Sequence, residues 1–237
     1  MNPKVAPFQS YINGILSLAY PNICKGCSTS LKARQEILCR KCISNLPRTG
    51  FEWAKDNPTN QSFWGRTPVV FAASTYYYRK GELLQSLIAM LKYKQRQDVG
   101  VFLGRLTGKL LQDSPFFETP DLIIPVPLHP RKFRLRGYNQ CDYIAKGISA
   151  EIAAPVINSA LMRDVYNPSQ TKKTRFERWE NVSGIFKVAV PQQLIDKHIL
   201  LVDDVITTGS TLEACCLPIS QISGTKVSIV TVGYSVR

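Results

Sequence analysis

The chain has 237 residues, enough for one large or two unequal domains, and 44% of them are hydrophobic, enough to build a core. Its 30 Lys and Arg against 17 Asp and Glu give a net charge of +13, which favours a polyanionic partner such as nucleic acid but equally fits a basic protein with an acidic small substrate. No apolar run approaches the roughly 18 to 20 residues of a membrane span, and the N-terminus lacks a signal peptide's charged start and apolar core. We therefore expect a cytoplasmic protein that is not integral to a membrane.

Residues 1–48 are predicted to form a small metal-binding domain. Apolar residues between Phe8 and Leu18 fit one face of a helix. Two Cys-x-x-Cys knuckles follow, and they contribute Cys24, Cys27, Cys39 and Cys42. Four thiolates suit tetrahedral Zn²⁺, which would be structural because no coordination position stays open. A redox dithiol pair and an iron–sulfur cluster are the alternatives.

Two cations on the second knuckle, Arg40 and Lys41, are candidate nucleic-acid contacts, although such charges are often simply solvated. Residues 49–68 contain Pro58, Pro68 and several turn-forming residues, which predicts a linker or an irregular wrap. We assign residues 69–237 to a second, larger domain.

This larger domain is predicted to begin with a strand over residues 69–78, where β-branched and aromatic residues are frequent. Helices are predicted from about residue 82 to residue 93 and over residues 99–111. The first helix ends in a basic, aromatic run, in which Lys92 and Lys94 are candidate contacts to nucleic acid. The alternative is an ordinary favourable charge pattern at a helix C-terminus.

Residues 121–124 are predicted to form a strand, which should end there because Pro125 and Pro127 follow. Four cations follow within six residues, in what we expect to be a loop: Arg131, Lys132, Arg134 and Arg136. Such a cluster balances a ligand with many negative oxygens, such as pyrophosphate or a nucleic-acid backbone, and we take Arg134 and Arg136 as candidate nucleic-acid contacts. A solvated basic loop is the alternative.

A helix over residues 139–153 and a strand over residues 156–162 are predicted next. The polar stretch 163–178 has no periodicity and is a candidate mobile lid. Three of its cations, Lys172, Arg175 and Arg178, are candidate catalytic residues that would close over the negative charge of a leaving pyrophosphate.

The stretch from Ile199 to Thr211 carries the most specific signal. Four apolar residues predict a strand buried on both faces, and Asp203 and Asp204 follow where we expect it to end. Small hydroxyl residues and Gly209 then lead into a helix, whose backbone N–H groups suit a phosphate. Carboxylates suit hydroxyl groups or a divalent cation, so a ligand that carries phosphate, diol and Mg²⁺ explains the whole stretch. The alternative is a strand-turn-helix with solvated acids.

The chain is predicted to end in the helix that this loop opens and one further strand. Pro218 should kink or end that helix after two turns. Residues 226–234 should then add a strand to the sheet.

The 199–211 stretch closely resembles the loop of type I phosphoribosyltransferases that binds phosphoribosyl pyrophosphate (PRPP). With the four cysteines, the block Val126-Pro-Leu-His-Pro-Arg131 and the block Arg136-Gly-Tyr-Asn-Gln140, the chain resembles the ComF family. That resemblance implies an α/β fold, with a phosphoribosyltransferase-like parallel sheet flanked by helices and a small N-terminal four-cysteine zinc ribbon. It implies that PRPP is bound by Asp203, Asp204, Val205, Thr207, Thr208, Gly209, Ser210, Thr211, Pro127, Leu128, His129 and Arg131.

Two functions fit these features. The first is a protein that binds PRPP with Mg²⁺ and single-stranded DNA and acts in DNA uptake during natural transformation, with an uptake helicase or channel as a candidate partner. The second is an active phosphoribosyltransferase that transfers ribosyl-5-phosphate from PRPP to a nucleobase or amine and releases pyrophosphate. No residue constellation in the sequence identifies an acceptor.

Overall fold

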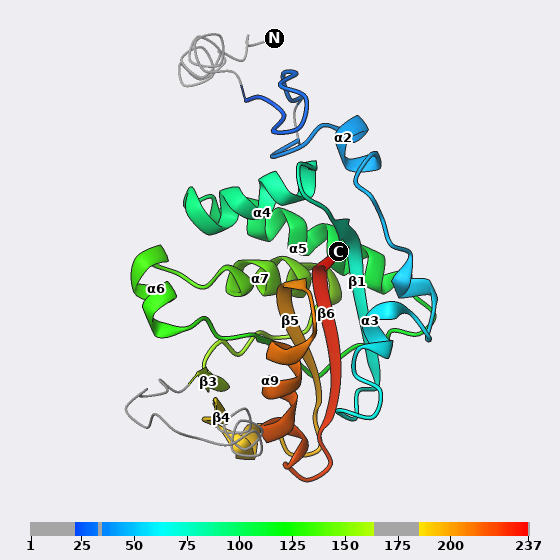
Figure 1. Ribbon diagram of the computed structural model, residues 1–237, viewed down its shortest axis with the longest axis vertical. Helices are drawn as coiled ribbons and strands as arrows, with labels where there is room; N and C mark the ends of the chain where they lie inside the picture. Colours follow the sequence, from blue (N-terminus) through cyan, green and yellow to red (C-terminus); the bar gives the residue numbers. More distant parts are fainter. Residues whose placement is uncertain (1–21, 33–34, 164–184, 237) are drawn as a thin grey trace, which may run out of the picture. The chain divides into compact units, whose positions relative to one another are not determined.

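The computed structural model describes residues 22–32, 35–163 and 185–236 (Figure 1). The chain divides into two compact units, Met1–Leu46 and Pro47–Arg237, here called unit 1 and unit 2. The helix predicted near residues 8–18 and the candidate lid residues Lys172, Arg175 and Arg178 lie outside the described residues. Within the described ranges, no helix is long and apolar enough to cross a membrane.

Unit 1 is held by short-range contacts around the cysteine knuckles. Ile23 forms an antiparallel bridge with Ser30, and the Lys25 amide donates to the carbonyl of Ile37 over 2.9 Å. The helix α2 (Arg40–Ser44) carries the last cysteine, and Ile37 and Leu38 are buried. Such a small set of buried apolar side chains among the described residues is typical of units that a metal ion or another cross-link stabilises.

Unit 2 is built on a four-stranded sheet with the strand order β1-β6-β5-β2. These strands are β1 (Phe71–Tyr78), β2 (Leu122–Pro125), β5 (His198–Ile206) and β6 (Lys226–Ser235). All neighbouring pairs are parallel. The predicted α/β fold with a parallel sheet flanked by helices is therefore confirmed.

Helices cover both faces of the sheet, since all four residues 199–202 of β5 are fully buried. Three helices pack side by side: α4 (Leu83–Tyr93), α5 (Gln97–Gln112) and α7 (Gln140–Ile152) (Figure 1). A methyl group on Gly147 would lie 2.2 Å from the carbonyl oxygen of Val101, so α5 and α7 approach each other closely only because glycine stands there. α9 (Ser210–Ser220) packs against β6.

The basic stretch after β2 is a helix rather than the predicted loop. α6 (Pro130–Arg136) starts because His129 Nδ1 accepts the Arg131 amide over 3.1 Å and Pro130 occupies the first helical position. It ends at Gly137, whose φ of 82° is left-handed.

The region after α7 also differs from the prediction. Val156 forms only an isolated bridge to Ile123, and the strand β3 (Leu161–Arg163) pairs antiparallel with β4 (Phe186–Val188). The short helix η2 (Pro191–Gln193) follows β4 and leads towards β5.

Of the two outcomes predicted for Pro218, a kink or a helix end, the structure excludes an end at that residue. α9 runs through Pro218 to Ser220, and its buried side chains Cys215, Cys216 and Ile219 hold that last turn in the core. Tertiary packing thus offsets the hydrogen bond that proline cannot make.

The stretch predicted as a linker, residues 49–68, lies within unit 2. It forms η1 (Phe51–Trp53) and α3 (Pro58–Gln61). The Asn57 side chain caps α3 and also donates to the carbonyl of Ala72 in β1 over 2.8 Å. Phe63 is buried, whereas Trp53 and Trp64 are exposed, so the segment is packed onto the sheet by side chains other than the tryptophans.

Candidate functional site

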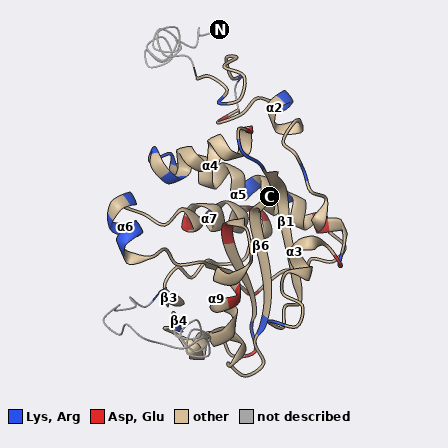
Figure 2. Cartoon of the chain, in the orientation of Figure 1, with Lys and Arg blue, Asp and Glu red and all other residues tan. Residues whose placement is uncertain are grey.

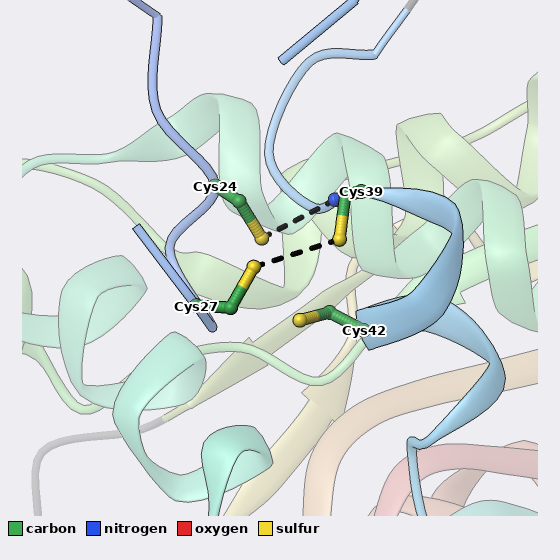
Figure 3. A group of neighbouring side chains, drawn as sticks. All are labelled: Cys24, Cys27, Cys39 and Cys42. Atoms are coloured by element: carbon green, nitrogen blue, oxygen red, sulfur yellow. Dashed lines mark hydrogen bonds between the residues drawn. The ribbon is translucent and has the colours of Figure 1, made fainter. Parts of the chain in front are cut away.

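The cysteines of unit 1 converge on one point, as Figure 3 shows. The sulfurs of Cys24, Cys27, Cys39 and Cys42 all lie within 4.8 Å of one another. Cys27 Sγ and Cys39 Sγ are 3.7 Å apart. Four sulfurs placed tetrahedrally about 2.3 Å from zinc would be about 3.8 Å apart, so the cluster can hold a zinc ion. Gathering all four thiols in one cluster favours a metal over two separate dithiols.

Hydrogen bonds from backbone N–H groups lower the pKa of one of these thiols and so favour the thiolate that binds a cation. Burial raises the pKa of Cys24, but the amides of Cys39 (3.3 Å) and Gly26 (3.4 Å) donate to its sulfur and bring the pKa down to about 6. By contrast, burial and the neighbouring thiols raise the pKa of Cys42 to about 12. Without a cation the four thiols therefore cannot all ionise near neutral pH, whereas a coordinated zinc ion deprotonates its thiol ligands.

We expect the double variant Cys27→Ser/Cys42→Ser to lose zinc, from about one ion per chain to almost none, because two of four thiolate ligands are removed. Plasma mass spectrometry of purified protein measures zinc and iron together. Cys216→Ser is the control, since that thiol is buried in α9. Equal zinc in all three proteins, or iron in place of zinc, would contradict the expectation.

In unit 2 the candidate PRPP residues 203–211 lie at the C-terminal end of β5 and directly after it. The strand does not end before the acids, as predicted, but continues through Asp203 and Asp204 to Ile206. Asp203 pairs with Thr231 of β6. Beyond the strand, Asp203 and residues 205–212 line a small cavity of about 40 Å³.

The first turn of α9 closes this cavity with backbone N–H groups. Gly209 precedes the helix with a φ of 78° and has no side chain to cap it, and the Ser210 amide donates to Thr208 Oγ1 over a long 3.5 Å. The hydroxyl oxygens of Thr208 and Ser210 are 3.0 Å apart at the same place. Uncapped N–H groups at a helix N-terminus attract anions, so a phosphate-sized group suits this position.

Two residues from the stretch predicted as a linker or an irregular wrap support the loop. Phe63 is one of the aromatic residues that suggest packing of this stretch, whereas no sequence pattern points to Arg66. The Arg66 guanidinium donates to the carbonyl of Thr208 over 3.1 Å and forms an ion pair with Glu213 of α9. Phe63 packs under the loop, since a methyl group on Gly209 would lie 3.3 Å from its ring. Together they hold the loop from outside the β5–α9 connection.

A lysine neutralises one of the two acids. Lys92, at the end of α4, places Nζ 2.8 Å from Asp204 Oδ2, and both side chains are largely buried, at 23% and 7% exposed. At this distance the opposite charges form an ion pair. Burial lowers the pKa of Lys92, but Asp204 and Asp203 raise it overall. The sequence suggested Lys92 as a nucleic-acid contact, whereas here its charge faces the carboxylates.

The other acid, Asp203, has a raised pKa. Burial and the charge of Asp204 raise the pKa of Asp203 to about 7, although its Oδ1 accepts a hydrogen bond from Cys141 Sγ over 3.3 Å. The sulfur and the two carboxylates also lie within 4.8 Å of one another. With Lys92 present, the carboxylates are suited to accept hydrogen bonds from hydroxyl groups rather than to enclose a bare cation on their own.

The residues after β2 reach the same edge of the sheet. Val126 N donates to the carbonyl of Val202 over 2.9 Å, and Asn139 Nδ2 donates to the carbonyl of Val126 over 3.0 Å. Pro127, Leu128, His129 and Arg131 follow directly. Burial, then the charges of Arg163, Arg131, Lys132 and Arg134, lower the pKa of His129. These four cations make the local potential positive, which suits a diphosphate.

Lys and Arg gather where α4 ends and along α6, as the blue segments in Figure 2 show, and the exposed rings of Tyr93 and Phe133 lie among them in the sequence. Tyr93 is 77% exposed, and the guanidinium of Arg136 lies 5.7 Å from its ring centre. Four further exposed cations complete what we call the α4–α6 surface: Lys94, Arg131, Lys132 and Arg134. In unit 1, the candidate contacts Arg40 and Lys41 are exposed at the start of α2.

Comparison with known proteins decides the family. No family model matches, but the chain is 30% identical over 210 residues to competence protein F of Haemophilus influenzae, a match that covers 85% of this chain and 86% of that protein. The chain belongs to the ComF family. It is also 29% identical over 202 residues to the DNA utilization protein YhgH of Shigella flexneri, with 83% of each chain covered.

Solved structures similar to this ComF-family chain are more distant. Glutamine PRPP amidotransferase from B. subtilis, complexed with ADP and GMP, is 18% identical, with a TM-score of 0.44 over 61% of this chain and 30% of its own. Adenine phosphoribosyltransferase from Leishmania tarentolae is 12% identical, with a TM-score of 0.34 over 80% of this chain and 94% of its own.

We expect Lys92→Met to destabilise unit 2 by about 3 kcal/mol, because it leaves Asp204 buried without a counter-charge. Urea unfolding measures this change. Lys94→Met is the matched control, since Lys94 is exposed two residues further along the chain. Adding Asp204→Asn to Lys92→Met should restore most of the lost stability. A double variant as unstable as the sum of the two single variants would show that the pair is not coupled.

Proposed function

We propose that this ComF-family protein binds PRPP with Mg²⁺ at the C-terminal edge of its sheet and binds single-stranded DNA on an adjacent surface. The observation that carries the PRPP part is that Asp203 and the N-terminus of α9 line one small cavity, with Asp204 next to Asp203 on β5. A diol and a phosphate on the same ligand need both features at once. PRPP carries both.

Each part of the ligand has matching residues at this edge. Asp203 and Asp204 would accept hydrogen bonds from the ribose hydroxyls, and residues 207–211 would surround the 5′-phosphate. Residues 127–131 would face the pyrophosphate, in the positive potential around His129. Mg²⁺ would neutralise the negative charge of the diphosphate, bound largely through the oxygens of PRPP, because Lys92 already compensates Asp204.

We propose that the DNA is held by the α4–α6 surface, with Arg40 and Lys41 of unit 1 as further contacts. Cations that follow a backbone, interleaved with exposed aromatic rings, are typical of sites that bind single strands. The names of the relatives, competence protein F and DNA utilization protein, support a role in DNA uptake during natural transformation. Such a protein would act in the cytoplasm beside an uptake helicase or channel, with a structural zinc ion in unit 1.

PRPP binding is tested by calorimetric titration of PRPP with Mg²⁺. We expect wild-type protein to bind one equivalent and Asp203→Asn/Asp204→Asn to bind at least tenfold more weakly, because both acceptors for the ribose hydroxyls lose their charge. Asp113→Asn removes an exposed carboxylate at the end of α5 and should bind like wild type. Circular dichroism confirms that each variant is folded. Undiminished binding by the double variant would place the ligand elsewhere.

DNA binding is tested by fluorescence anisotropy with a labelled oligo-dT at several salt concentrations. Removing two cations with Lys132→Ala/Arg134→Ala should weaken binding and reduce the slope of log K against log salt concentration by about 1.4, since each lost phosphate contact contributes about 0.7. Lys109 is an exposed cation in the last turn of α5, outside the α4–α6 surface. Lys109→Ala should therefore leave that slope unchanged. A salt-independent affinity would argue against a phosphate-binding surface.

The positive potential around His129 also favours a second function, an active phosphoribosyltransferase, because it would stabilise a leaving pyrophosphate. The protein would contribute positioning and charge stabilisation to an in-line displacement at C1 of the ribose. Release of pyrophosphate on adding a nucleobase or an amine to the PRPP complex distinguishes this function from binding alone.

A further inference from the structure

A second cavity in unit 2, of about 500 Å³, lies beside α7. It shares no lining residue with the small cavity at the β5–α9 loop. Its walls come from α6, the α6–α7 connection, one side of α7 and the chain after that helix, and they include Phe133, Tyr138, Asn139, Tyr143, Lys146 and Asn158. Neither the PRPP site nor the strand-end acids account for this cavity.

The helix pattern explains why polar groups line it. α7 buries Cys141, Ile144 and Ile148, so Asp142, Lys146 and Ser149 project from another side of the helix at the spacing i, i+4, i+7. The left-handed Gly137 turns the chain out of α6 and towards α7. The cavity is therefore built from two packed elements and does not depend on a single loop.

The lining combines flat apolar rings with hydrogen-bonding groups. Tyr138 and Tyr143 meet edge to face, with ring centres 5.4 Å apart, and Phe133 is 47% exposed. Asn139 Nδ2 donates to Asp142 Oδ1 over 2.9 Å, and burial raises the pKa of Asp142 to about 6. An aromatic, planar ligand with donors and acceptors around its edge matches such walls.

We propose that this cavity receives a nucleobase of bound single-stranded DNA, an inference that rests on the DNA-binding surface proposed above. The argument is the position of Phe133, which lines the cavity and is flanked in sequence by the exposed cations Lys132 and Arg134, whose side chains leave α6 about 100° to either side of it. A DNA backbone that crosses α6 at either cation brings bases within reach of the cavity. Stacking on aromatic side chains is sequence-tolerant, because every base has a flat π-face. The loop cavity, at about 40 Å³, is too small for a base.

The experiment compares two labelled 12-nucleotide strands in the same anisotropy assay: oligo-dT, and an abasic strand with the same number of phosphates. We expect wild-type protein to prefer oligo-dT by about tenfold, from stacking. Phe133→Ala should lose most of this preference while its affinity for the abasic strand stays unchanged. Phe133→Tyr should keep the preference. Leu135→Ala is the matched control, because Leu135 is on the same helix, is 90% exposed and does not line the cavity.

Each other outcome is informative. Equal wild-type affinity for the two strands would overturn the cavity proposal and leave the DNA-binding surface standing. Binding of neither strand would overturn both. Equal losses in Phe133→Ala and Leu135→Ala would assign the effect to general surface hydrophobicity and overturn the proposal. Displacement of oligo-dT by free dTMP at micromolar concentration, abolished by Phe133→Ala, would show that the occupant is a free nucleotide rather than DNA.

Discussion

The position of β5 determines every candidate site at the strand ends of unit 2. It is paired in parallel with β2 on one side and β6 on the other, so three strands deliver their C-terminal ends to one edge. The register sets Pro125 opposite Val202, which brings the segment after β2 level with Asp203. Because β5 is buried on both faces, a shift of one residue would exchange its two sets of side chains. The geometry of the acids is thus set by core packing across the sheet.

That geometry places two carboxylates next to each other, and a lysine at the end of α4 compensates the charge of one of them. Two adjacent carboxylates in a partly buried position repel each other, and the raised pKa of Asp203 reflects this. Lys92 offsets part of the cost by pairing with Asp204. The next residue, Tyr93, is exposed at the α4–α6 surface. Neighbouring residues at one helix end therefore contact the strand-end acids and the basic surface, so the two candidate sites are physically connected.

The parts of this site that could be predicted from the sequence are those marked by a pattern of neighbouring residues. The apolar run before Asp203 predicts β5, and the two Cys-x-x-Cys knuckles predict the cluster. The contacts that hold the site together join distant segments: Arg66 reaches Thr208, Phe63 packs under Gly209 and Lys92 pairs with Asp204. No local pattern marks them, because each partner has an ordinary role in its own segment. The helix through Pro218 shows the same limit, since burial of its neighbours overrides an intrinsic preference.

Part of the net positive charge of the chain is concentrated at one place in unit 2. Six cations lie on the α4–α6 surface or pair at its edge with Asp204. Three of them, Arg131, Lys132 and Arg134, also lower the pKa of His129. PRPP and DNA are both polyanions, so each would neutralise part of the field that attracts the other. Two anionic ligands drawn to one positive region oppose each other unless a cation accompanies one of them. In the function proposed above, Mg²⁺ bound to PRPP would supply that cation and would allow the small ligand and the nucleic acid to be held together.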